Sequence, residues 1–364
     1  MMLLGSDHDV TRLYRLLFGA LGAATAVALF IICLFTPWPV YLLDHLNLRS
    51  YFLPDLACNG CNDFSAKYII ENENFCRDNS GQFEDITLLI LVASYHPNAQ
   101  ARSAIRDTWA SIRQYKDHRI RTVFLFGIHN DKNLNAQIQY ELKHHGDVIQ
   151  ANFTDRYLTL TNKSIIGLNW AMKNCPNVKY VLKTDDDAFN IPQRFVDYVT
   201  TIRDERFVGG YCFTIKPDRR DGSKFYTRPD QYPDYYYPTY CSGPGYVLSR
   251  AAVVAILEAA KNRRFLHMED VFVTGICRSA VDIPYTQIPG VLMGHQYFDK
   301  CSVSTWIKNT HNVIPEQMTH IWNHMVLKGD KSKHCVVSYL QMTTVLLIVA
   351  IVWVKILHTL YRKR

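Results

Sequence analysis

The chain has 364 residues, of which 48% are hydrophobic and 20% are charged. This composition excludes an intrinsically disordered protein, because the apolar residues suffice for a packed core. The length predicts roughly two domain-sized units, or one large domain with attached segments. The formal net charge is +7, and no basic stripe carries interleaved aromatic residues, so we expect no nucleic-acid partner.

The first predicted element is a membrane anchor. An uncharged apolar run extends from Leu16 to Phe35, which is about the 20 residues that a helix needs to cross a bilayer. Arg12 and Arg15 precede it, so residues 1–15 are expected in the cytosol. The alternative is a buried helix of a soluble core, for which such a long apolar run is unusual.

A second apolar run closes the chain. It covers residues 335–354, and the basic residues Lys355 and Arg362 to Arg364 follow it within the tail 355–364. Its length also fits a membrane span, with both termini cytosolic and the middle of the chain in the lumen. The alternative is a C-terminal helix that packs on the domain.

Cysteines and glycosylation sequons agree with a luminal location. Eight cysteines lie between the apolar runs, and an oxidising lumen allows them to pair. Cys58 and Cys61 have the spacing of half a zinc site, but no second pair matches, so a disulfide between them is favoured. Asn152 and Asn162 each begin a glycosylation sequon. These features predict a membrane protein of the secretory pathway.

Residues 36–83 are polar and read as a luminal stem, and strands alternate with helices after it. Strands are expected over 86–94, 120–127, 148–152 and 178–184, and helices over 99–114, 133–145 and 160–174. This alternation predicts an α/β fold with a largely parallel, Rossmann-like sheet. Ligands bind beyond the carboxyl ends of the strands in such sheets.

Three consecutive carboxylates, Asp185, Asp186 and Asp187, end the strand expected over 178–184. They repel one another, and a divalent cation such as Mg²⁺ or Mn²⁺ would relieve the repulsion through hard oxygen ligands. The alternative is a solvated turn or a helix cap. Their place after a buried strand favours a metal site.

Four motifs in order resemble the Golgi β-1,3-glycosyltransferases. They are RSAIRDTW (102–109), YVLKTDDDAF (180–189), YPTYCSGPGYVLSR (237–250) and MEDVFVTGIC (268–277). The resemblance covers residues 86–306 and implies the A-type glycosyltransferase fold for a catalytic domain over 84–330. It further implies a UDP-sugar donor, a Mn²⁺ cofactor, inversion at the anomeric carbon and a Golgi membrane location. The second apolar run departs from the single anchor usual in the family.

The resemblance also implies roles for the acidic residues. Asp187 is expected to bind the metal together with His295, while Asp185 and Asp186 contact the ribose or the waters of the metal. Asp270 is expected to act as the general base, with Glu269 as its neighbour or a sugar ligand. The alternative for this pair is the N-terminus of a helix, which favours acidic side chains.

The remaining expected site residues bind the donor and the acceptor. Arg106 is expected to contact the diphosphate or the uracil, with an ordinary solvated helix face or an ion pair with the neighbours of Asp107 as the alternatives. Gly243 and Gly245 allow close backbone approach to a substrate, and Tyr240 belongs to a tyrosine-rich stretch suited to stacking on sugars. We expect a glycan acceptor on a glycoprotein or glycolipid at these three residues.

The sequence predicts a membrane-embedded transferase that moves galactose from UDP-galactose in β-1,3 linkage. A β-1,3-N-acetylglucosaminyltransferase is the alternative, because the KTDDDAF motif fits both groups. A non-catalytic luminal membrane protein with the same fold, which binds glycans, is the alternative from another class. Intact carboxylates at both acidic motifs argue against it.

Overall fold

The computed structural model describes residues 56–65, 67–294 and 300–326. Both predicted membrane segments, 16–35 and 335–354, lie outside these ranges, as does His295. Within the described ranges, no helix combines the length and the apolar character that a membrane span requires.

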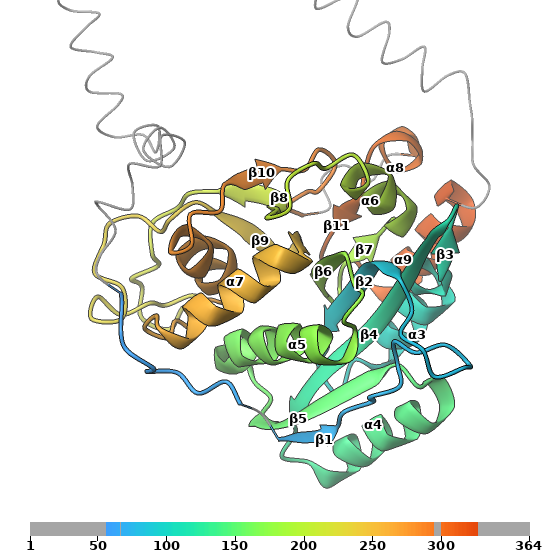
Figure 1. Ribbon diagram of the computed structural model, residues 1–364, viewed down its shortest axis with the longest axis horizontal. Coiled ribbons are helices and arrows are strands. Elements are labelled where there is room, and N and C mark those ends of the chain that lie inside the picture. The colour runs from blue at the N-terminus through green and yellow to red at the C-terminus, as the bar shows by residue number, and fades with distance from the viewer. Residues whose placement is uncertain (1–55, 66, 295–299, 327–364) are drawn as a thin grey trace, which may run out of the picture.

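One mixed sheet of nine strands forms the centre of the domain, and its path runs β1-β5-β4-β2-β6-β9-β8-β10, with β3 paired to β4 (Figure 1). The four strands β5, β4, β2 and β6 are mutually parallel, as predicted, whereas β9 runs antiparallel to both β6 and β8. The bounds are β1 Tyr68–Ile70, β2 Ile86–Ala93, β3 Gln114–Tyr115, β4 His118–Ile128, β5 Val148–Thr154, β6 Tyr180–Asp185, β8 Val208–Phe213, β9 Tyr240–Ser249 and β10 Tyr285–Gln287. A separate pair joins β7 Phe189–Asn190 to β11 Asn309–Thr310.

Helices cover both faces of the sheet. They are α3 Ala99–Asp107, α4 Lys132–His145, α5 Leu160–Asn174, α6 Pro192–Val199, α7 Arg250–Lys261, α8 Lys300–Thr305 and α9 Pro315–Ile321, with π-helical turns η4 Val271–Cys277 and η5 Trp322–Val326. The helix expected over 99–114 is shorter than predicted. It ends where the Thr108 hydroxyl donates to the Ala104 carbonyl oxygen (2.6 Å), and a 3-10 turn then buries Trp109.

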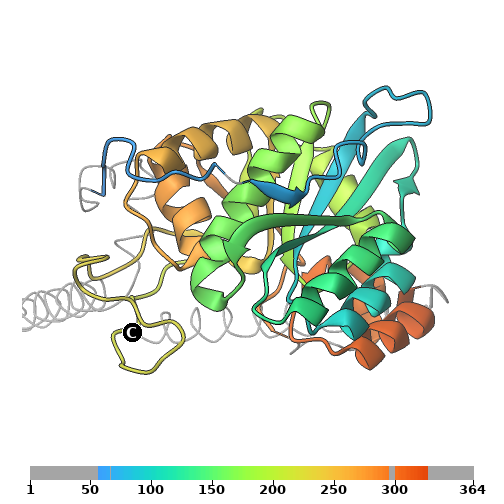
Figure 2. The same ribbon diagram turned by 90° about the horizontal axis from the view of Figure 1, so that it is seen from below.

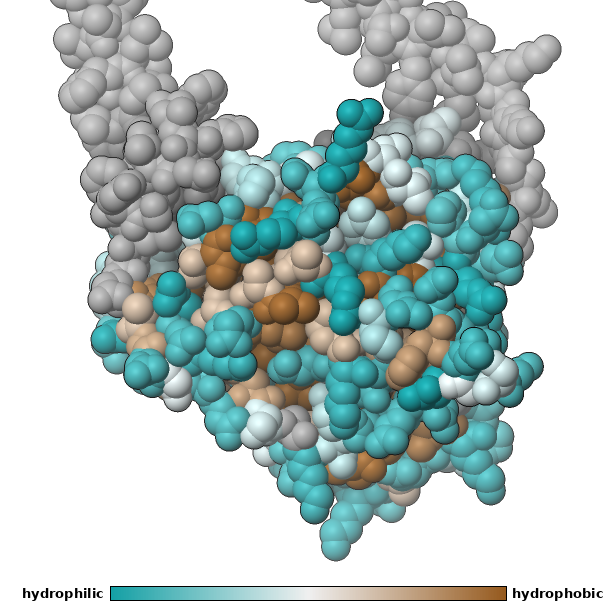
Figure 3. Space-filling model, in the orientation of Figure 1, coloured by the Kyte–Doolittle hydropathy of each residue, from teal (hydrophilic) through white to brown (hydrophobic). Residues whose placement is uncertain are grey.

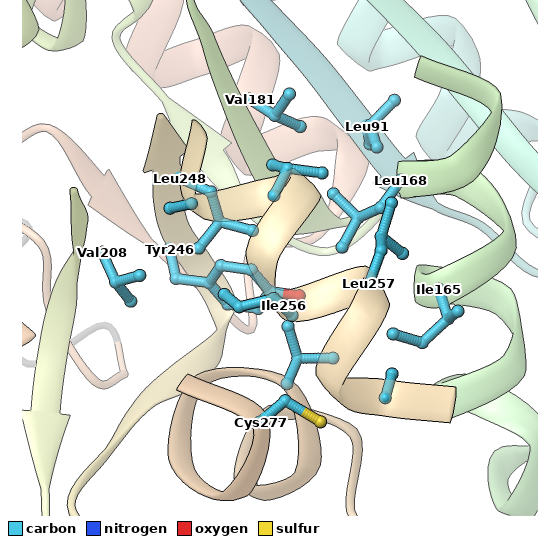
Figure 4. Packing of buried hydrophobic residues seen from close by; sticks show 14 of the residues in the cluster. Leu91, Ile165, Leu168, Val181, Val208, Tyr246, Leu248, Ile256, Leu257 and Cys277 are labelled. Carbon is cyan, nitrogen blue, oxygen red and sulfur yellow. The ribbon is translucent and has the colours of Figure 1, made fainter. Parts of the chain in front are cut away.

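The core lies in two layers because β2 buries side chains on both of its faces. Leu89 and Leu91 point to the layer that contains α5, α7 and η4, while Leu88 and Ile90 point to the layer that contains α3, α6 and α9. Figure 4 shows the first layer, where Leu168 of α5 lies near residues of α7 and β9. On the face shown in Figure 3, most side chains are hydrophilic and apolar areas lie between them.

The domain begins before residue 84, where the sequence placed its boundary. Within the predicted stem, β1 pairs with β5, and Leu56 and Cys76 are buried in the core. A disulfide joins Cys76 to Cys175 at the end of α5. Residues 56–83 are therefore part of the folded domain.

Disulfides link Cys58 to Cys61 and Cys212 to Cys241 as well. The first is the pair that the sequence favoured over a zinc site. The second connects β8 to β9 at the base of the long segment between them.

Candidate active site

The turn after β6 brings two of its three carboxylates to a cavity at the carboxyl ends of the central strands. The cavity has a volume of about 770 Å³, and Asp185 and Asp187 line it. The opposite part of its wall comes from Glu269 and Asp270, which precede η4, and from Tyr240 and Gly243 of β9. Because β9 runs antiparallel to β6, its first residues lie beside the end of β6.

Burial and neighbouring negative charges raise the pKa of Asp187. Burial, together with Asp185 and Asp186, raises the pKa of its carboxyl group to about 6. A bound cation would relieve this repulsion, as the sequence analysis expected.

Asp186 turns away from the cavity and holds the loop that follows β2. Its carboxylate accepts hydrogen bonds from Ser94 Oγ (2.7 Å), the Tyr95 amide (3.1 Å) and Asn98 Nδ2 (3.0 Å). Burial nevertheless raises its pKa. The sequence analysis expected a ribose or water contact here, but the structure gives this carboxylate a positioning role.

Glu269 is buried and Asp270 is half-buried, and the two carboxylates differ in their partners. Asp270 Oδ2 accepts from the Gly243 amide (3.1 Å) and Oδ1 from the Val271 amide (2.9 Å). Burial and the neighbouring Glu269 raise its pKa to about 7. Glu269 Oε1 accepts from the Tyr246 hydroxyl (2.6 Å). Asp270 therefore combines a cavity position with the pKa of a general base at neutral pH.

Lys183 joins the two acidic groups, and the sequence analysis assigned it no role. Its side chain is 3% exposed, and its Nζ lies 2.6 Å from Asp185 Oδ1 and 3.4 Å from Glu269 Oε2. It also donates to the Gly243 carbonyl oxygen (3.0 Å). Burial lowers its pKa, but Asp185 and Glu269 outweigh burial, so the net direction is upward. A lysine inside the buried strand pattern YVLKT was the signal available in the sequence.

The structure describes two imidazoles at this cavity, His267 and His311, while His295 lies outside the described residues. His311 lines the cavity, and its Nδ1 accepts from the Gly294 amide (3.1 Å). The Val313 amide donates to the Asp187 carbonyl oxygen (2.9 Å), which places this segment beside the acidic turn. No hydrophobic periodicity marks His311, so only tertiary structure reveals it.

Gly243 and Gly245 have different surroundings. A Cβ at Gly243 would lie 3.5 Å from carboxylate oxygens of Glu269 and Asp270, which is ordinary contact. A Cβ at Gly245 would lie 2.6 Å from Asn309 Oδ1. Gly245 thus allows close packing of β9 against Asn309, whereas Gly243 and Tyr240 line the cavity.

Arg106 does not line the cavity. Its Nη2 pairs with Glu141 (2.8 Å) and its Nε with Asp147 (2.8 Å), and its guanidinium lies over the Phe124 ring. Arg102 is fully buried and pairs with the same Glu141 (2.6 Å). Arg106 therefore forms ion pairs instead of the expected donor contact, and its partners are Glu141 of α4 and Asp147 after it, not the neighbours of Asp107.

The two glycosylation sequons differ in accessibility. Asn152 is exposed on β5, whereas Asn162 is half-buried in α5 and its Oδ1 is shielded from solvent. Attachment at Asn152 needs no rearrangement of the domain. Both modifications stay predictions.

Comparison with known proteins agrees with this geometry. Residues 100–289 match the family model described as Galactosyltransferase. The chain belongs to the galactosyltransferase family. It is 33% identical over 291 residues to mouse beta-1,3-galactosyltransferase 1, covering 78% of this chain and 87% of that protein. It is also 33% identical over 283 residues to mouse beta-1,3-galactosyltransferase 2, covering 75% and 65%.

Solved structures resemble this galactosyltransferase domain more distantly. The bifunctional glycosyltransferase WbbM aligns with a TM-score of 0.33 and 8% identity over 57% of this chain and 39% of that chain. Mouse xyloside xylosyltransferase 1 aligns with a TM-score of 0.33 and 11% identity over 63% and 97%. Likeness at this level says nothing of the activity of the domain.

Proposed function

We propose that this protein is an inverting transferase that moves galactose from UDP-galactose in β-1,3 linkage to a glycan acceptor. Membership of the galactosyltransferase family supports the reaction class and an A-type glycosyltransferase fold. The observation that carries the proposal is the position of Asp270, a half-buried carboxylate with its pKa raised to about 7, in a cavity with a second acidic group at Asp185 and Asp187.

Asp270 accepts the proton of the attacking hydroxyl group. The Gly243 and Val271 amides each donate to one of its oxygens, and this fixes the carboxylate while leaving lone pairs for the acceptor. The acceptor oxygen bonds to the anomeric carbon, and the bond from that carbon to the diphosphate breaks. The electron pair leaves with UDP, and the single displacement inverts the anomeric centre.

The donor set at Asp187 fits a cation shared with the substrate. Within residues 56–65, 67–294 and 300–326, no three potential ligands cluster as a closed metal cage. Mg²⁺ and Mn²⁺ are commonly bound through one or two carboxylates plus substrate phosphates, and Asp187 with its raised pKa suits that arrangement. Mn²⁺ would neutralise charge on the leaving diphosphate. His295 stays a predicted ligand, and His311 is a described imidazole beside this corner.

We propose a Golgi membrane location with the transferase domain in the lumen, either as a single-pass type II protein or with two spans that leave both termini in the cytosol. The two apolar runs support this topology, and three disulfides support an oxidising compartment.

The test is sugar transfer from UDP-galactose in the presence of Mn²⁺. Asp270→Asn should lower kcat by at least about 100-fold, because the base is lost, while Asp187→Asn should weaken Mn²⁺-dependent UDP binding. Since only ionised Asp270 is active, kcat/KM of the unmodified protein should rise with pH through about 7.

Glu258→Gln on the exposed side of α7 serves as the control and should leave transfer unchanged. Full activity of Asp270→Asn would contradict the assigned base. UDP-N-acetylglucosamine as a competing donor tests the alternative sugar. A glycan-binding protein without activity would transfer neither galactose nor N-acetylglucosamine.

A further inference from the structure

The outer wall of the cavity comes from the segment between β8 and β9. Figure 2 shows this segment, drawn in yellow, extending from the body of the domain. The disulfide Cys212–Cys241 closes its base, and the Tyr237 hydroxyl donates to Thr227 Oγ1 (2.7 Å) inside it. The segment is thus an internally bonded part of the site. Its residues that line the cavity include Phe213, Ile215, Lys216, Arg220, Lys224 and Phe225.

Two lysines of this wall are held by aromatic rings. Lys216 Nζ lies 4.1 Å from the centre of the Tyr235 ring and donates to its hydroxyl oxygen. Lys224 Nζ lies 4.8 Å from the centre of the Phe225 ring and 5.8 Å from that of Tyr157. Ring contacts restrict an ammonium group without neutralising its charge.

These lysines differ from the arginine beside them. Arg220 binds Asp218 through Nε (2.9 Å) and Nη2 (2.7 Å), so that pair is neutral. In the part of the chain that the structure describes, the ion pairs include no partner for Lys216 or Lys224. The outer rim is therefore cationic, whereas the inner end is acidic.

Tyr157 connects the rim to the reacting end. Its ring lies 6.2 Å from that of Phe225, which is 42% exposed. Tyr157 lines the same cavity as Asp185 and Asp270. The two rings are inclined by 74°, so a sugar next to the reacting one would stack its apolar side on one ring and meet the edge of the other.

We propose that the acceptor is an anionic saccharide, whose negative group is bound by Lys216 and Lys224 while its next sugar stacks on Tyr157 and Phe225. This inference rests on the proposed transferase function and names the class of its acceptor. The negative group is a uronate or sialate carboxylate, or a sulfate ester. Both anions complement the unneutralised charge of the rim.

The experiment compares three trisaccharides with the same non-reducing N-acetylhexosamine. The sugar next to this N-acetylhexosamine is a neutral hexose, a hexuronate or a sulfated hexose. Each trisaccharide is assayed with the full-length protein, Lys216→Gln, Lys224→Gln and the double variant. Lys143→Gln is the matched control, because Lys143 is exposed on α4 and does not line the cavity.

The unmodified protein should prefer one of the charged acceptors. Each single variant should lower kcat/KM for that acceptor about 2- to 5-fold, and the double variant about 5- to 20-fold, as expected for exposed ion pairs. The preference should shrink with added salt. Values for the neutral acceptor and the KM of UDP-galactose should not change.

Equal kcat/KM for neutral and charged acceptors in the unmodified protein would overturn the inference. A raised KM of UDP-galactose in the lysine variants would also overturn it, because the rim would then bind the donor. Absence of transfer to every acceptor would contradict the proposed function instead. Calorimetric titration with the same three trisaccharides would then test the rim by itself. Tighter binding of the charged trisaccharides that is lost in the double variant would support anion binding by the rim. Equal binding of all three would refute it.

Discussion

A single buried cation organises the acidic residues of the active site. Lys183 contacts both Asp185 and Glu269, so its charge offsets repulsion that would otherwise separate these two acidic groups. It also lowers the pKa of Asp270, which burial and Glu269 raise. Lys183 is therefore a positioning residue for the proposed reaction.

Replacement of Lys183 tests this role. Lys183→Met should lower kcat/KM at least about 10-fold, equivalent to ~1.4 kcal/mol. It should also move the acidic limb of the pH profile above about 7, because the positive charge that lowers the pKa of Asp270 is lost. Lys183→Arg retains the charge and should keep the limb in place. An unshifted profile in Lys183→Met would contradict the electrostatic role.

Gly243 and Gly245 provide a matched pair for separating function from packing. Gly245→Ala places a methyl group against the buried Asn309 side chain and should destabilise the domain by about 1–3 kcal/mol. Gly243→Ala meets only ordinary contacts, so it should leave stability nearly unchanged and lower kcat by crowding the cavity beside Asp270. Urea unfolding and transfer assays on both variants measure the difference, and equal stabilities would refute the packing argument.

At the scale of elements, an ion-pair network joins α3 to α4. Glu141 accepts from both Arg102 and Arg106, and Asp147 binds Arg106 as well. Arg102 additionally donates to the Tyr95 and His96 carbonyl oxygens, so the network also supports the loop that Asp186 holds. These arginines therefore shape the donor side of the cavity without lining it.

Glu141→Gln removes the shared acceptor charge of this network. We expect a loss of about 3–5 kcal/mol in the free energy of unfolding, because a buried guanidinium is left without its carboxylate. Asp197→Asn is the control, since its pair with Lys116 is exposed and should change stability by less than about 1 kcal/mol. Urea denaturation compares the two, and similar losses would contradict a buried network.

At the scale of the whole molecule, the folded unit extends back to residue 56. The strand β1 lengthens the sheet beyond β5, and the disulfide Cys76–Cys175 ties this segment to α5. Figure 1 shows the segment, drawn in blue, running along the domain.

A fragment that starts at residue 84 should be less stable than one that starts at residue 56. Loss of the disulfide alone should cost about 2–5 kcal/mol, and loss of β1 exposes the edge of β5. Thermal unfolding of both fragments measures this difference. The Cys76→Ser, Cys175→Ser double variant of the longer fragment separates the contribution of the disulfide from that of β1. Equal melting temperatures of the two fragments would support a domain boundary at residue 84.

Local pattern determined much of this protein. The helix Leu160–Asn174 was predicted with its observed bounds, and β2 was predicted as a buried strand within one residue, because hydrophobic periodicity is a local property. The spacing of Cys58 and Cys61 favoured a disulfide there, and the resemblance to the β-1,3-glycosyltransferases implied that Asp187 and Asp270 belong to one site, where both line the cavity.

Tertiary structure alone decided which partner each charged side chain meets. Arg106 binds Asp147, 41 residues away, and Lys183 binds Gly243, 60 residues away. Neither pairing has a signature in local sequence, because an ion pair forms wherever folding brings charges together in a poorly solvated place. The same holds for His311 beside Asp187 and for the cationic rim, which exist only once β9, β11 and the segment before β9 meet at one end of the sheet.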